Sequence, residues 1–217
     1  MAIATNLLQI KSTLPEHVNL VAVSKTKPVS DLMEAYEAGQ RIFGENKIQE
    51  MAEKWEQMPK DIQWHMIGHV QTNKVKFMAP FVSLIHGVDS LKLLQEINKQ
   101  GKKNNRIIDC LLQIHIAEEE TKFGLDEEEL ASLVSSNEIQ ELKNIRIVGL
   151  MGMATFTDNK EQVKKEFTHL KSIFDQTKIN NAKFTILSMG MSGDYQLAIE
   201  CGSTMVRIGS SIFGGRN

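Results

Sequence analysis

Val21-Ala22-Val23-Ser24-Lys25-Thr26-Lys27-Pro28 is the stretch around which the chain is organised. It reads as a short apolar strand that ends in a lysine and stops at a proline, which cannot extend a strand's hydrogen bonding. Val21, Val23 and Lys25 share one face, because side chains alternate along a strand. If that face points into a core, the lysine is partly desolvated, and desolvation favours the neutral, nucleophilic amine. The alternative is an exposed lysine that reaches water from the strand end.

Composition places the chain among soluble globular proteins. Its 217 residues are 41% hydrophobic and 24% charged, which suits one large domain with a sizeable core. The net charge of -2 argues against nucleic-acid binding, which needs a basic patch. We find no signal-peptide pattern and no apolar run long enough to span a bilayer. Cys110 and Cys201 have no metal-ligand spacing and are too few for a disulfide framework, so we expect a cytoplasmic protein.

Short β-rich runs alternate with helical patterns along the whole chain, which predicts a parallel sheet. The predicted strands are residues 20–24, 41–44, 62–67, 82–86, 107–116, 145–151, 184–187 and 204–208. Eight β/α units predict a TIM-type (β/α)8 barrel, a single α/β domain over residues 1–217 with no room for a second domain. An open, doubly wound sheet is the alternative, because the second strand is weak.

Three helix starts are predicted from capping residues. Ser30 and Asp89 each precede a helical pattern and can cap it. Asp126 with Glu129 three positions on resembles a capping box.

The active site of such a barrel lies at the C-terminal ends of its strands. Small or polar residues stand at most of these ends: Lys25, Gly44, Glu45, Asn46, His65, Gly68, Met151, Gly152, Ser188, Gly190, Arg207 and Gly209. The loops after the last two strands, 188–193 and 209–211, are rich in glycine and serine. Their backbone N–H groups and hydroxyls can hold a phosphate, since phosphate sites in these barrels commonly use those two loops. Two ordinary tight loops are the alternative.

Arg207 stands in the middle of an apolar strand, where an arginine must be paired or face a ligand. A structural ion pair with Glu45 or Glu200 explains it as well as a ligand contact does.

His65 and His69 are four residues apart, which is metal-ligand spacing on a helix. Gly68 breaks that helix, and no carboxylate or cysteine completes a ligand set. We therefore expect no metal site, and predict that the two histidines line a pocket rim or cap the helix.

Five segments in chain order carry a resemblance to a known family: 23–28, 43–46, 64–74, 188–192 and 206–209. Together they resemble the pyridoxal phosphate homeostasis proteins, also called the proline-synthetase co-transcribed type. The resemblance implies a single barrel like the N-terminal domain of alanine racemase (fold type III), carrying pyridoxal 5'-phosphate (PLP).

The resemblance also implies roles for individual residues. Lys25 would hold PLP as a Schiff base. The cofactor would be bound by Lys25, Asn46, His65, Ser188, Arg207, Gly209 and Ser210. Of these, Ser188 and the backbone of Gly209 and Ser210 would hold the phosphate. Arg207 would face the pyridine nitrogen, and Lys27 matches a second family lysine.

An arginine at the pyridine nitrogen donates a hydrogen bond and does not protonate the ring, which weakens carbanion stabilisation. Alanine racemase adds a tyrosine from its second domain as an acid/base group. We therefore expect a PLP carrier or regulator of vitamin B6 and amino-acid homeostasis, with little or no catalysis, rather than an enzyme. A small amino-acid racemase using Lys25 as base is the alternative, and a barrel for another phosphate ester is a third.

The expected partners are PLP and PLP-dependent apo-enzymes, with no nucleic acid or membrane, and the expected state is monomeric. Whether residues 115–124 form a lid stays open.

Overall fold

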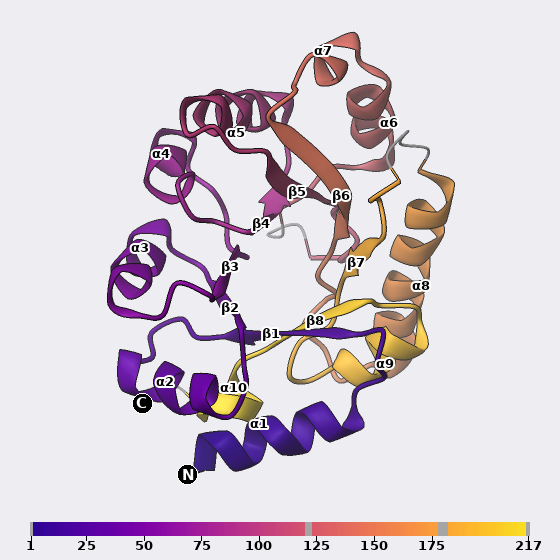
Figure 1. Ribbon diagram of the computed structural model, residues 1–217. Coiled ribbons are helices and arrows are strands. Elements are labelled where there is room, and N and C mark those ends of the chain that lie inside the picture. Colours follow the sequence, from indigo (N-terminus) through magenta and orange to yellow (C-terminus); the bar gives the residue numbers. More distant parts are fainter. Residues whose placement is uncertain (1, 120–122, 178–181, 216–217) are drawn as a thin grey trace.

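Eight parallel strands form a closed ring with the helices outside it (Figure 1). The computed structural model describes residues 2–119, 123–177 and 182–215. The strands are β1 (Asn19–Val23), β2 (Ile42–Glu45), β3 (Gln63–Met66), β4 (Leu84–Val88), β5 (Ile108–Gln113), β6 (Ile145–Met151), β7 (Ile186–Ser188) and β8 (Met205–Ile208). The helices are α1 (Ala2–Thr13), α2 (Val29–Glu37), α3 (Ile48–Gln57), the 3-10 turn η1 (Thr72–Lys74), α4 (Val75–Met78), α5 (Leu91–Lys103), α6 (Glu127–Ser135), α7 (Asn137–Gln140), α8 (Lys160–Gln176), α9 (Tyr195–Glu200) and α10 (Ser210–Phe213).

The first and last strands pair with each other and close the barrel. β1 lies between β2 and β8, and Val21 is in register with Arg207. The predicted (β/α)8 barrel is therefore confirmed, and the open doubly wound sheet is wrong. The weak second strand forms because its neighbours supply pairing partners on both sides, β1 on one and β3 on the other.

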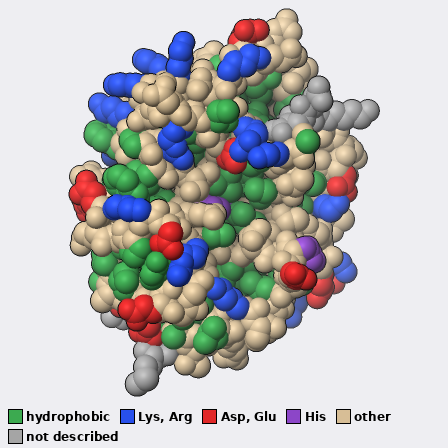
Figure 2. Space-filling model, in the orientation of Figure 1, with side chains coloured by type: hydrophobic (Ala, Val, Ile, Leu, Met, Phe, Trp, Pro, Cys, Tyr) green, Lys and Arg blue, Asp and Glu red, His purple; other side chains and the backbone are tan. Residues whose placement is uncertain are grey.

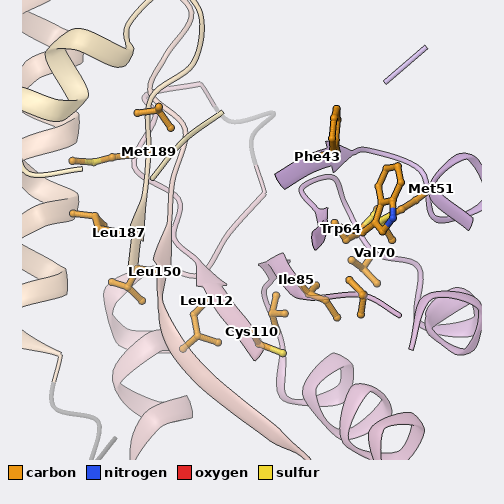
Figure 3. Close-up of a cluster of buried hydrophobic side chains, with 14 of the residues drawn as sticks. Phe43, Met51, Trp64, Val70, Ile85, Cys110, Leu112, Leu150, Leu187 and Met189 are labelled. Carbon is orange, nitrogen blue, oxygen red and sulfur yellow. The ribbon is translucent and has the colours of Figure 1, made fainter. Parts of the chain in front are cut away.

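Two apolar layers hold the ring together. The inner layer consists of Val21, Leu84, Leu111, Val148, Met151 and Met205. The outer layer lies between strands and helices, and Figure 3 shows part of it, with Phe43, Met51 and Trp64 together on one side. Val21 belongs to the inner layer and Ala22 to the outer one. The alternation predicted for the first strand is thus confirmed, and it directs the following residues of that face towards the top of the barrel.

One glycine is required by the packing of two strands. A Cβ on Gly149 would lie 1.7 Å from the backbone oxygen of Ile186 on β7. Gly149 pairs with Leu111 where the register of β5 and β6 shifts. Only a residue without a side chain fits at this irregularity.

One of the three predicted helix caps is confirmed and two are wrong. Asp126 and Glu129 form the full capping box of α6, as expected. Ser90, and not Asp89, caps α5 through its hydroxyl, and Ser30 lies inside α2. The predicted 82–86 strand lies two residues further along, at Leu84–Val88. None of the described helices is long and apolar enough to cross a membrane.

Charges of both signs are spread over the face of the molecule drawn in Figure 2, around a middle of hydrophobic and uncharged groups. Such a mixture is in keeping with the net charge of -2.

Candidate functional site

A cavity of about 690 Å³ lies at the C-terminal ends of the strands. Of the seven predicted site residues, five line it: Lys25, Asn46, Arg207, Gly209 and Ser210. They come from the loops after β1, β2 and β8 and from β8 itself. A smaller hollow of about 350 Å³ lies near the N-terminal ends of β1 and β2, and none of the predicted site residues lines it.

Lys25 stands in a tight turn just beyond β1. The N–H of Lys27 donates to the carbonyl of Ser24 at 3.1 Å, which folds the chain back around Lys25. Thr26 has a φ of 64°, a left-handed conformation that β-branched residues rarely adopt. Both lysines line the cavity, and Lys27 also donates to the carbonyl of Gly215 at 3.0 Å. The turn therefore brings Lys25 to the cavity, as the strand pattern predicted.

Arg207 lies at the floor of the cavity, although its side chain is almost fully buried. Its guanidinium donates to Ser188 Oγ at 2.5 Å and to the carbonyl of Gly152 at 3.2 Å. Burial lowers the pKa of Arg207 to about 10, opposed by the nearby Asp194. Arg207 keeps its charge at neutral pH and can only donate hydrogen bonds.

Neither of the two ion pairs considered for Arg207 is found in the described structure. Within residues 2–119, 123–177 and 182–215, Arg207 forms no ion pair with Glu45 or Glu200. Glu45 is bound instead by Lys54, at 2.6 Å.

Ser188 and His65 are predicted to bind the cofactor, but both lie below the cavity and do not line it. Both are buried, and they belong to a chain of polar contacts that leads away from Arg207. Ser188 Oγ lies 3.0 Å from His86 Nδ1, and His86 Nε2 lies 2.9 Å from His65 Nδ1. Burial lowers the pKa of His65 to about 3 and that of His86 well below its usual value. Two neutral histidines and a serine thus form a buried support beneath Arg207.

Sequence reasoning missed His86. A histidine inside a strand that is otherwise apolar was the available signal, because a buried polar side chain needs a partner. The periodicity of the strand gives no hint of which partner that is.

The loops after β7 and β8 meet at one side of the cavity. Ser192 Oγ accepts a hydrogen bond from the N–H of Gly209 at 3.3 Å. Ser192 and Ser210 both line the cavity. A Cβ on Gly209 would lie 3.1 Å from the carbonyl oxygen of Val23, so the loop packs closely over β1. Hydroxyls and one backbone N–H are therefore gathered here.

On the opposite side, two aromatic rings form the rim. His69 stacks on Phe123 with ring centroids 4.5 Å apart, and both line the cavity. The prediction that the two histidines line a pocket rim or cap the helix is confirmed for His69, which lines the cavity, and is wrong for His65, which is buried below it. Among the residues described, no group of three potential ligands could hold a metal ion. The lid question for 115–124 involves residues 120–122, which lie outside the described residues.

Comparison with known proteins identifies the family. The family model described as "Alanine racemase, N-terminal domain" matches residues 1–217. The pyridoxal phosphate homeostasis protein of Pasteurella multocida is 39% identical, with 100% of this chain and 99% of the relative covered. That of Haemophilus influenzae is 40% identical, with 92% and 86% covered. This chain belongs to the pyridoxal phosphate homeostasis protein family.

Solved structures agree with this family and with its fold. PipY of Synechococcus elongatus, solved without PLP, has a TM-score of 0.92 at 33% identity and covers 98% of this chain and 100% of its own. PipY with PLP bound has a TM-score of 0.87 at the same identity and coverage. Alanine racemase of Bartonella henselae, 19% identical with a TM-score of 0.77, covers 99% of this chain and 58% of its own, and shows the fold alone. The resemblance read from the sequence segments is confirmed.

Proposed function

We propose that this family member binds PLP and acts in PLP homeostasis, with residues 1–217 working as one PLP-binding domain. The observation that carries the proposal is the meeting of Lys25, Arg207 and the two serine-glycine loops around one cavity. These groups suit three polar parts of PLP, namely its aldehyde, its pyridine nitrogen and its phosphate. The PLP-bound PipY structure of a 33% identical relative supports the same ligand.

In this proposal Lys25 is the covalent anchor. Its ε-amine would hold the cofactor through the aldehyde carbon, with loss of one water. Arg207 donates a hydrogen bond to the pyridine nitrogen. Asn46 lies at the cavity wall as a further polar contact.

We assign the phosphate to the backbone of Gly209 and to the hydroxyls of Ser210 and Ser192. This changes the expected set, because Ser188 is buried with its hydroxyl between Arg207 and His86. Ser188 and His65 act through Arg207 and support its position. Ser192 stands in the same loop and lines the cavity, so it takes the role first given to Ser188.

We infer that catalysis is weak and that the protein is a PLP carrier or regulator. An arginine partner leaves the pyridine nitrogen unprotonated, so the bound cofactor supplies a poor electron sink. The described cavity lining contains no tyrosine that could serve as a second acid/base group. Transfer of PLP to apo-enzymes, a monomeric state and a cytoplasmic location remain predictions.

The first experiment is an absorption spectrum of the purified protein with added PLP, followed by borohydride reduction and peptide mass mapping. A visible band that reduction fixes on the Lys25 peptide supports the proposal. The band should be lost in Lys25→Ala and kept in Lys27→Ala, the matched neighbour. A colourless wild-type protein that takes up no PLP overturns it and points to another phosphate ester. An amino-acid racemase rate like that of a dedicated enzyme would favour the enzyme alternative.

A further inference from the structure

A group of three charged side chains, two of them buried, lies behind the turn that carries Lys25. Lys54 on α3 donates to Glu45 Oε1 at 2.6 Å and to Glu50 Oε1 at 2.8 Å. Glu45 and Lys54 are buried, and Glu50 is partly exposed. None of the three lines the cavity, so they do not touch a ligand there.

This charged triad holds the backbone on both sides of Lys25. Before it, Lys54 donates to the carbonyl of Ser24 at 2.7 Å, and Ser24 Oγ donates to Glu45 Oε1 at 2.6 Å. After it, the N–H of Thr26 donates to Glu50 Oε1 at 2.6 Å. Hydrogen bonds to charged groups are stronger than neutral ones, so both peptide groups that flank Lys25 are firmly held.

The turn needs such support. Thr26 has a φ of 64°, and a β-branched residue enters the left-handed region only where its surroundings enforce it. Glu50 accepts from the N–H of this same residue, so it holds the conformation together with the bond from Lys27 N–H to the Ser24 carbonyl.

Stability alone is a weak reason for such a triad. A buried ion pair gains little over apolar residues of similar size, because desolvating the charges offsets their attraction. Glu45 Oε2 is buried with no hydrogen-bond partner in the described structure. Burial raises the pKa of the Glu45 carboxyl, although Lys54 opposes that shift.

We propose that Glu45, Glu50 and Lys54 are positioning residues that hold the Lys25 turn so that the lysine amine stays directed into the cavity. This inference rests on the proposed function, in which Lys25 carries PLP. It assigns a role in PLP binding to three residues that contact no part of the cavity.

The test compares Glu50→Ala with Glu50→Gln. The amide keeps an oxygen that accepts from Thr26, whereas alanine removes the acceptor. We expect Glu50→Ala to weaken PLP binding about tenfold and to slow Schiff-base formation, both followed by absorbance, while Glu50→Gln stays within about threefold of wild type. Asp109→Ala removes a comparable ion pair, the one with Arg146, which does not line the cavity. It should leave PLP affinity unchanged even if the melting temperature falls.

A second variant separates positioning from general loss of structure. Glycine adopts a positive φ without strain, so Thr26→Gly makes the turn accessible without Glu50. In the Thr26→Gly background, Glu50→Ala should cost threefold or less in PLP affinity instead of about tenfold. Equal costs in the two backgrounds would overturn the proposal, because they would mean that Glu50 does not act through the turn.

Labelling of the PLP-free proteins distinguishes this inference from the proposed function. The proteins are treated with an amine-reactive ester, and peptide mass mapping gives the ratio of the labelling rate of Lys25 to that of Lys27. This ratio should be at least threefold higher in Glu50→Ala than in wild type. If wild type binds PLP but Glu50→Ala matches it in affinity and labelling, the positioning role is wrong and the function stands. If wild type takes up no PLP, the function fails, and an unchanged labelling ratio then also overturns the positioning role.

Discussion

Arg207 donates a hydrogen bond of 2.5 Å to the hydroxyl oxygen of Ser188 at the floor of the cavity. Because arginine only donates, Ser188 Oγ accepts in this contact and keeps its own proton. We assign that proton to His86 Nδ1, which lies 3.0 Å away, so that His86 Nε2–H donates to His65 Nδ1. In this assignment each histidine is the neutral tautomer that carries its proton on Nε2. A residue that would contact the cofactor is thus held by a chain of buried polar contacts.

Replacing Ser188 should loosen Arg207. Ser188→Ala leaves buried donors and acceptors on Arg207 and His86 without a partner, which costs about 1–3 kcal/mol of unfolding free energy. We also expect PLP affinity to fall roughly fivefold, equivalent to about 1 kcal/mol. Urea unfolding and PLP titration measure the two effects.

Ser203→Ala is the matched control, because Ser203 is also buried and, among the described residues, its hydroxyl bonds only to backbone carbonyls away from the cavity lining. It should destabilise the fold while PLP affinity stays at the wild-type value. Equal losses of affinity in the two variants would contradict a specific support for Arg207.

The buried histidines should make the fold sensitive to acid. In the unfolded chain a histidine titrates near 6.5, whereas the pKa of folded His65 is about 3, lowered by burial. Between these values the unfolded state binds the extra proton. Stability is therefore fully present above about pH 6.5 and falls as the pH drops towards 3. The slope should reach about 1.4 kcal/mol per pH unit for each histidine held neutral.

Urea unfolding at a series of pH values tests this dependence. His65→Gln should have a shallower slope than wild type between about pH 6.5 and 4, because one titrating group is gone. Identical slopes in the two proteins would show that His65 is not held neutral.

Gly149 should tolerate no side chain. A Cβ there would lie 1.7 Å from the backbone oxygen of Ile186, and backbone cannot move aside as a flexible side chain can. Gly149→Ala should cost more than about 3 kcal/mol or prevent folding, which circular dichroism and urea unfolding would reveal. Gly193, which has open space around its Cβ position, is the control and should accept alanine with little change. A stable Gly149→Ala protein would mean that β6 and β7 separate more easily than their register implies.

The strand pattern predicted the barrel because its evidence is local. The alternation of side chains around Val21 and the turn residues after each strand are properties of short segments. They can be read without knowing how distant parts of the chain pack. Helix caps were less predictable: Asp89 and Ser90 are both good capping residues, and the backbone geometry at that point decides between them.

The cavity lining followed from position, since Lys25 and Arg207 stand at or near strand ends. The side chains that support Lys25 and Arg207 from behind could not be predicted in this way. His86 and Lys54 reach the site across neighbouring elements, through contacts between residues 21 to 102 positions apart in the chain. The loop after β7 does line the cavity, which is why the sequence indicates Ser188 as a phosphate ligand. The Ser188 side chain, however, is buried below the cavity, and Ser192 of the same loop lines it instead. Such distinctions depend on side-chain direction within a loop, which composition does not encode.

The phosphate assignment makes a prediction about which ligands respond to which serines. Ser192→Ala and Ser210→Ala each remove a hydroxyl that we assign to a charged phosphate, a contact worth about 1.5–3 kcal/mol. PLP affinity should therefore fall at least tenfold in each variant. Pyridoxal has the same ring and aldehyde but no phosphate, so its affinity should change less than about twofold.

Ser211 provides the control, since it is exposed next to Ser210 and does not line the cavity. Ser211→Ala should bind both ligands as wild type does. Equal losses for PLP and pyridoxal in the Ser192 and Ser210 variants would mean that these serines shape the cavity in general. The phosphate would then have to be held by other groups, with the backbone N–H of Gly209 as the first to examine. A loss confined to PLP would fix the orientation of the cofactor, with its phosphate at the loops after β7 and β8.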